Sequence, residues 1–210
     1  MNRKILRAYG LYTGGVIGVG IFGLPAALHA SGIVIFVVSL LSVAALVWFI
    51  HRSLLEVVIA TNGKHRLPGY ARLYLGSGGF KIAAAANMLG LFGALIAYLI
   101  AGGTFLRLLF EGFLDLSPAA ATIGYALPGA LLLLWGLRAL PTLEVVILGA
   151  FLLVLTLLSV AAIPHFDVQR VLSSGDPVDA LLPYGVLLFS FWGLSMVPET
   201  FELVGRKKKR

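Results

Sequence analysis

The chain has 210 residues, of which 60% are hydrophobic and only 12% are charged. A soluble domain carries roughly 25% charged residues, so this composition excludes a soluble enzyme or binding module and indicates an integral membrane protein. The chain has no cysteine and four scattered histidines, so it offers neither a disulfide framework nor a metal-ligand cluster. No acid–base or nucleophilic constellation is visible, and we predict no catalytic residue and no metal site.

The apolar segments are long enough to cross a membrane, which requires about 20 residues for a hydrocarbon core about 30 Å thick. On this rule the sequence predicts six membrane-spanning helices, at 8–29, 33–59, 80–106, 119–138, 142–163 and 181–203. A polar turn and a short interfacial helix are expected between the second and third spans. No strand is expected, so the predicted fold class is an all-α membrane protein.

The positive charges follow the topology of these spans. All lysines and arginines except Arg107 and Arg170 fall on one side of the predicted membrane, and the basic run 206–210 lies at the same side. The positive-inside rule therefore places both termini in the cytoplasm, in a multi-pass protein of the cell's inner (plasma) membrane. The same asymmetry explains the net charge of +7. The predicted partner is therefore the lipid bilayer, and no nucleic acid partner is expected.

The first span contains an unusual stretch, Thr13–Pro25, that is rich in glycine and ends in proline. Within a helix each glycine costs about 1 kcal/mol relative to alanine, and proline about 3 kcal/mol. We therefore predict that this helix breaks at membrane depth. Unpaired backbone groups at that depth are tolerated only where protein or a water-filled cavity covers them, so the break indicates a site.

The pattern of these glycines also fits two other known motifs. Gly10, Gly14 and Gly18 form a G-x-x-x-G ladder, which is typical of closely packed membrane helices; a packing face remains an alternative that can coexist with a site. The segment Gly18–Gly23 also fits G-x-G-x-x-G, but a dinucleotide site needs a preceding strand and an acidic residue about 20 positions on. The first acidic residue here is Glu56, so we reject the dinucleotide hypothesis.

The sixth span repeats the peculiarity of the first, because Gly193 and Pro198 interrupt it near mid-membrane. Two glycine- or proline-interrupted spans at corresponding positions of two halves point to a transporter binding site. In the third span, Tyr98 follows small residues at helical spacing. Its hydroxyl needs a hydrogen-bond partner when buried. That partner is either a group on a neighbouring helix or a ligand in the predicted binding site.

Broken helices offer complementary charges to a zwitterion. Free N–H groups at the start of a second half-helix attract a carboxylate, and free carbonyls at the end of a first half-helix hold a cation or an amine. An amino acid carries both charges, so we predict an amino acid substrate. Glu199, further along the sixth span, is either a functional intramembrane acid or a solvated side chain at the cytoplasmic end.

The two interrupted segments also resemble a known family. Gly15–Pro25 resembles the first span of the amino acid/polyamine/organocation transporter superfamily, and Pro183–Gly193, continuing to Pro198-Glu199, is similar to the sixth span of its bacterial amino acid/auxin permease branch. Leu67–Ala71 is similar to the loop after the second span. The resemblance implies a LeuT-type fold of two inverted five-span repeats and a secondary-active permease, without cofactor, driven by Na⁺ or H⁺.

The resemblance assigns boundaries and site residues by position. Residues 1–163 would form the first five-span repeat, 164–180 an extracytoplasmic loop, and 181–210 the first, broken span of the second repeat with its basic cytoplasmic tail. The resemblance implies that the backbone of Gly14, Gly15, Ile17, Gly18 and Gly20 meets the substrate's carboxylate, with Phe189, Ser190 and Trp192 on the other side. With Tyr98 and Gly193, identified above from the residues alone, these make up the predicted substrate-binding residues.

Family members have ten or more spans, whereas this sequence ends after the sixth. The spans that are missing include the eighth, which completes an ion site in Na⁺-coupled members. We therefore expect the N-terminal portion of an amino acid permease, from a truncated gene or a fragment, with a second chain as a candidate supplier of the remaining spans. The alternative is a non-transporting membrane subunit or assembly module derived from such a permease.

Overall fold

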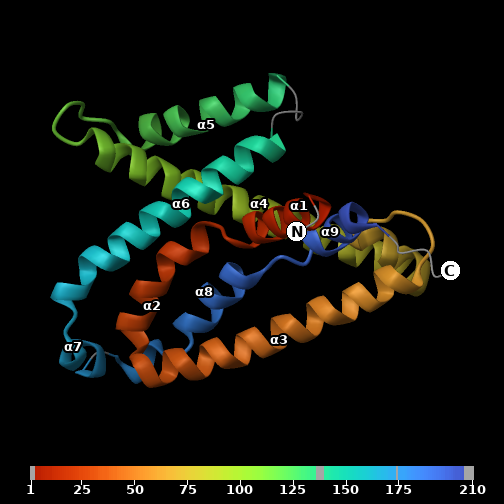
Figure 1. The fold of residues 1–210 in the computed structure, drawn as a ribbon, viewed down its shortest axis with the longest axis horizontal. Coiled ribbons are helices and arrows are strands. Elements are labelled where there is room, and N and C mark those ends of the chain that lie inside the picture. Colours follow the sequence, from red (N-terminus) through yellow and green to blue (C-terminus); the bar gives the residue numbers. More distant parts are fainter. Residues whose placement is uncertain (1–2, 136–139, 174, 206–210) are drawn as a thin grey trace. The chain divides into compact units, whose positions relative to one another are not determined.

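The computed structural model describes residues 3–135, 140–173 and 175–205, and within these ranges the regular elements are all helices (Figure 1). The prediction of an all-helical chain is confirmed. The elements are α1 Arg3–Val16, η1 Val19–Gly23, α2 Leu24–Ser31, α3 Ile33–Ala60, α4 Leu67–Phe110, α5 Pro118–Trp135, α6 Leu140–Ala162, η3 Ile163–His165, α7 Val168–Ser173, η4 Pro177–Asp179, α8 Leu182–Phe191 and α9 Met196–Val204.

Among the described residues, four helical segments are long and apolar enough to cross a membrane: Ile33–Ala60, Leu67–Phe110, Val146–His165 and Leu182–Val204. The bent pair Ala8–Val16 and Val19–Ser31 makes a fifth if it counts as one span. These observations describe a multi-pass membrane protein. The predicted count of six is not confirmed, because the apolar part of α5 covers only Pro118–Leu134. The end of that predicted span, 136–138, and the basic tail 206–210 lie outside the described residues.

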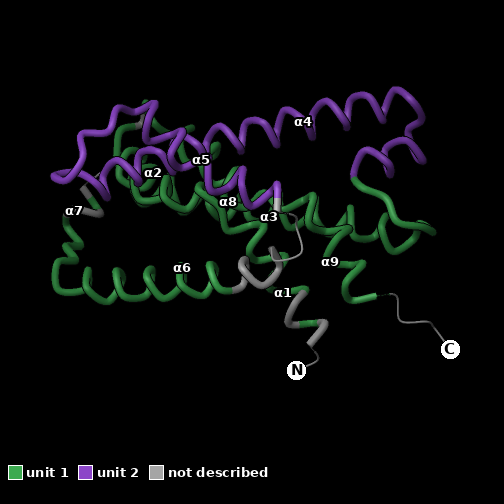
Figure 2. The backbone as a smooth tube through the Cα atoms, turned by 90° about the horizontal axis from the view of Figure 1, so that it is seen from above, with its two compact units in different colours: residues 1–66, 141–210 green, residues 67–140 purple. Residues whose placement is uncertain are grey.

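The chain forms two compact units, which Figure 2 shows in different colours. Unit 1 comprises residues 1–66 and 141–210, and unit 2 comprises residues 67–140. Both interrupted segments identified in the sequence belong to unit 1, although about 170 residues of sequence separate them. The predicted division into repeats stays a prediction.

Unit 1 is organised around α8, which lies between α2 and α3 and also contacts η1, while α1 packs against α9 (Figure 1). Its core consists of Val43, Val47 and Leu187, with Leu24, Phe36, Leu40, Leu188 and Phe191 packed around them. Lipid tails are as apolar as these side chains, so close packing rather than removal from water drives helix association in a membrane. The interlocked α3 and α8 therefore give the two breaks a fixed support.

Unit 2 contains α4 and α5, which pack against each other. Gly76 has a φ of 71°, a conformation that glycine adopts without steric cost, and it divides α4 into a short segment and a long one. The short segment, which begins at Leu67, corresponds to the predicted interfacial helix. Further along α4, Gly102 and Gly103 are buried, Gly102 against the ring of Tyr125 and Gly103 against Thr122.

Replacing Gly103 with alanine is expected to destabilise unit 2. A Cβ at Gly103 would lie 2.5 Å from Thr122 Oγ1 and 2.9 Å from Thr122 Cα, and backbone cannot move aside cheaply. Overpacking of this kind costs about 1–3 kcal/mol. Gly93→Ala is the matched control on α4, because a Cβ there meets nothing within 4 Å. Thermal unfolding in detergent should show a lower Tm for Gly103→Ala alone; equal Tm values would contradict the packing described.

Candidate functional site: two interrupted helices

The first break falls where the glycine-rich sequence predicts it. Helix α1 ends at Val16, the next two residues are not helical, and the following helical segments turn away by 44°. Gly18 is fully extended, with φ −125° and ψ −167°, and caps the start of η1. The prediction that the first span is interrupted is therefore confirmed, at Ile17–Gly18.

The second break lies at the predicted place in the sixth span. Helix α8 ends at Phe191, Trp192 is extended with φ −75° and ψ 101°, and α9 begins only at Met196. The backbone N–H of Met196 donates to the carbonyl of Gly193 at 2.9 Å, which starts the second half-helix. Residues 192–195 thus form a four-residue interruption.

Pro25 and Pro198 have a different role from the interruption predicted for them. Pro25 and Pro183 are each the second residue of their helix, and Pro198 is the third residue of α9. The first N–H groups of a helix have no partner within it, so proline in the first turn removes no hydrogen bond and its fixed φ suits the helix. These prolines begin half-helices rather than interrupt them, and the glycine segments make the breaks.

The breaks leave backbone groups without helical partners. Within the described residues, no hydrogen bond is found from the backbone N–H groups of Gly18, Val19 or Gly20, which begin the second half of the first span. The same holds for the carbonyls of Phe191 and Trp192 at the end of α8. Donors at one break and acceptors at the other are the groups that a zwitterionic ligand requires.

The two breaks pack against each other through glycine. A Cβ at Gly20 would lie 2.5 Å from Ser190 Oγ and 3.0 Å from Ser190 Cα, and one at Gly15 would lie 2.6 Å from Met196 Cγ. Gly193 in turn lies against Val16. Real Cβ atoms essentially never come this close to a neighbour, so a larger residue at Gly20 would press on the backbone of Ser190. At Gly15 and Gly193 the side chains of Met196 and Val16 would have to shift to admit a Cβ. The packing ladder of Gly10, Gly14 and Gly18 stays a prediction.

The structure brings together most of the residues predicted from the sequence. Gly15, Gly20, Phe189, Ser190 and Gly193 take part in the contacts between the two broken helices. Gly14, Ile17 and Gly18 are partly buried on the same segment, and Trp192 is 46% exposed beside the second break. The Ser190 hydroxyl donates to the carbonyl of Val186 at 2.7 Å, so its lone pairs remain available as acceptors.

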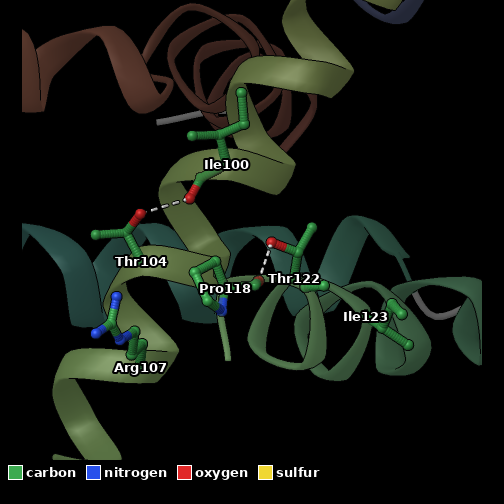
Figure 3. A pocket seen from close by; sticks show the side chains of 8 residues that line it. Ile100, Thr104, Arg107, Pro118, Thr122 and Ile123 are labelled. Carbon is green, nitrogen blue, oxygen red and sulfur yellow. Dashed lines mark hydrogen bonds between the residues drawn. The ribbon is translucent and has the colours of Figure 1, made fainter. Parts of the chain in front are cut away.

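Tyr98 is the one predicted site residue outside unit 1. It lies on α4 and is 39% exposed, and its place in the site stays a prediction. Unit 2 has a pocket of its own, of about 490 Å³, between α4 and α5 (Figure 3). The hydroxyls of Thr104 and Thr122, which line this pocket, donate to the carbonyls of Ile100 and Pro118. Arg107 is the charged residue among those that line it.

Sequence reasoning missed Tyr12 and His51. The Tyr12 hydroxyl oxygen lies 3.2 Å from His51 Nδ1, and the two rings meet edge to face with centroids 6.2 Å apart. His51 Cε1 would lie 4.0 Å from a Cβ at Gly193, so the imidazole is close to the second break. The sequence signal for His51 is that it is an ionisable residue within a predicted apolar span. Metal-ligand spacing, the criterion applied to the histidines above, does not detect this signal.

Glu199 has a partner on the loop after α3. Its carboxylate lies 3.5 Å from Arg66 Nε, and Glu202 lies 3.4 Å from Arg66 Nη1 and 3.5 Å from Lys64 Nζ. The Glu199 side chain is 33% exposed, so it is neither an isolated intramembrane acid nor a freely solvated one. The four side chains tie α9 to the loop before α4.

These features define a multi-pass, all-helical membrane protein with two discontinuous spans packed break against break, the arrangement that many transporters use for their binding sites. The chain belongs to the transmembrane amino acid transporter family, whose family model matches residues 1–205. Its members are transporters rather than enzymes. No curated protein and no solved structure matches the chain significantly.

Proposed function

We propose that the chain binds an amino acid at the paired breaks and takes part in its secondary-active transport, coupled to Na⁺ or H⁺. The observation that carries this proposal is the mutual packing of the two interrupted spans in unit 1. Membership of the transmembrane amino acid transporter family supplies the substrate class. Discontinuous helices in transporters expose backbone groups to substrate and coupling ion near the bilayer midplane.

The proposed ligand is held by its two charged ends. The carboxylate accepts hydrogen bonds from the N–H groups of Gly18, Val19 and Gly20, where the helix dipole also favours negative charge. The ammonium group donates to the carbonyls of Phe191 and Trp192 at the end of α8. These contacts use the backbone common to all amino acids, so side-chain selectivity falls to the groups around them, with Phe189 and Trp192 as the apolar walls and Ser190 as a hydroxyl acceptor.

The pairing of half-helices supports a LeuT-type arrangement for these two spans. The first half of one span packs against the second half of the other, α1 against α9, and η1 and α2 pack against α8. This pairing of the first half of each span with the second half of the other arises when two antiparallel spans cross at their breaks. Spans related by an inverted repeat are antiparallel in this way. The positive-inside rule then orients the protein in the inner membrane with both termini cytoplasmic.

Uptake of labelled amino acids into proteoliposomes that contain the purified chain tests this function. We expect saturable uptake from a mixture of amino acids under an imposed Na⁺ or H⁺ gradient, with protein-free vesicles as the control. Saturable binding without uptake would favour a non-transporting membrane subunit. Absence of both saturable binding and uptake would contradict the proposal.

A further inference from the structure

His51 occupies a special position in unit 1, because it lies where the two broken helices cross. It belongs to α3, it is hydrogen-bonded through Nδ1 to Tyr12 of α1 at 3.2 Å, and its Cε1 lies beside Gly193 in the second break. A single imidazole therefore touches the helix that precedes the first break and faces the backbone of the second. Any change in this ring acts on both interrupted spans.

The other ring nitrogen of His51 is buried and has no hydrogen-bond partner among the described residues. Leaving a buried polar group unpaired costs about 1–3 kcal/mol, so a nitrogen kept in this state indicates a role beyond packing. Imidazole is the side chain whose charge ordinarily changes between about pH 5 and pH 8. Ionisable side chains within membrane spans mark ion and proton pathways.

The described carboxylates near His51 are paired with other groups. Two of the described carboxylates near α3, Glu199 and Glu202, are engaged by Arg66 and Lys64, and Glu56 pairs with Arg52 at 3.2 Å on the exposed side of α3. The other titratable groups described on the helices that meet α3 are Tyr9, Tyr12, His29 and Tyr184. Of these, Tyr12 bonds His51 and the other three are exposed. A proton on the imidazole would therefore add a positive charge that no described carboxylate neutralises.

We propose that His51 is the residue that binds the coupling proton, an inference that rests on the proposed transport function. The neutral ring donates from Nδ1–H to the Tyr12 hydroxyl, which can accept in either protonation state. One proton taken from the aqueous phase adds to the lone pair of Nε2 and gives an imidazolium. Release of that proton to the opposite side restores the neutral ring, so one proton crosses for each cycle.

The protonated ring would alter the second break. Its new Nε2–H needs an acceptor, and the carbonyls of Phe191 and Trp192 are without hydrogen-bond partners in the described structure. These same carbonyls are the proposed partners of the substrate's ammonium group. Protonation of His51 and occupation of the break by an amino acid therefore compete for one set of acceptors, and this competition couples release of the proton to binding of the substrate.

The test compares His51→Asn with wild type in proteoliposomes. Asparagine places an amide at the position of Nδ1, so it can keep the bond to Tyr12 but does not titrate. Because proton and substrate compete, we expect wild type to accumulate labelled amino acid when the vesicle interior is more acidic than the outside. For His51→Asn we expect binding and exchange at constant pH to persist, a flat pH profile of binding, and accumulation no greater than in protein-free vesicles. His29→Asn, an exposed histidine on α2, should behave as wild type.

The outcomes separate this inference from the proposed function. Gradient-driven accumulation by His51→Asn at the wild-type level would overturn the assignment of His51 while leaving amino acid transport intact. Loss of binding as well as accumulation would show a structural role and would equally overturn it, as would wild-type accumulation that follows a Na⁺ gradient and ignores pH. If wild type binds no amino acid at any pH, the proposed function itself fails.

Discussion

Replacing Gly20 with leucine should weaken saturable amino acid binding by about 10-fold to more than 100-fold. A Cβ alone at this position would lie 2.5 Å from Ser190 Oγ, 2.9 Å from Phe189 Cδ1 and 3.0 Å from Ser190 Cα. Leucine adds three further carbon atoms, so α8 must move away from η1 and the donors of one break separate from the acceptors of the other. Each 1.4 kcal/mol of lost interaction weakens binding about tenfold, and overpacking of about 1–3 kcal/mol or more is expected here.

The matched control is Gly185→Leu on α8. A Cβ at Gly185 meets nothing within 4 Å, and the change is chemically identical. Equilibrium binding of labelled amino acids to both variants in detergent or nanodiscs measures the difference, with gel filtration as the check on folding. Gly20→Ala serves as a milder variant and should weaken binding without aggregation. Wild-type affinity in a monodisperse Gly20→Leu would show that the close approach of the breaks is unnecessary for binding.

A disulfide between residues 15 and 196 should form almost completely on mild oxidation. The chain has no cysteine, so Gly15→Cys with Met196→Cys introduces a single pair. A Cβ at Gly15 would lie 2.6 Å from Met196 Cγ, which is the position that the sulfur of a cysteine at 196 would take. Disulfides require Cβ atoms about 3.5–4.5 Å apart, and this geometry suits them.

Cleavage at a protease site engineered into the 164–180 loop makes the cross-link visible on a gel. The two fragments should stay joined after oxidation and separate on reduction. The control pair, Gly185→Cys with Met196→Cys, should not cross-link, because Gly185 faces open space. Cross-linking of both pairs to the same extent would mean that α1 and α9 do not pack as described.

The sequence was sufficient to predict where the helices break, because the energetic cost of glycine is local. A run such as Gly18-Val19-Gly20 cannot compete with an ordinary helical sequence, whatever surrounds it. The role of the prolines was predicted wrongly for a reason that is also local. Proline excludes a helix only when its N–H would have been bonded, and Pro25 and Pro198 both lie in a first turn.

The contacts across the breaks could not be predicted from the sequence. Nothing in the spacing of Gly15 and Met196, or of Gly193 and Val16, shows that they meet, since helix crossing depends on side chains distant in the chain. His51 belongs to the same category: only its proximity to Tyr12 and Gly193 distinguishes it from the other histidines. The number of spans was also not fixed by the sequence. Counting apolar segments by length predicts six spans, but the described apolar part of α5 is too short to count as a membrane span by itself.

The central claim, that the paired breaks hold an amino acid by its carboxylate and its ammonium group, is tested most directly by competition binding. The wild-type chain in nanodiscs is equilibrated with a labelled amino acid and challenged with the unlabelled amino acid, its amide, or the amine without the carboxylate. Hydrogen bonds to charged groups contribute about 1.5–3 kcal/mol, so both analogues should compete roughly 10- to 100-fold more weakly than the amino acid. Equal competition by all three compounds would contradict this account.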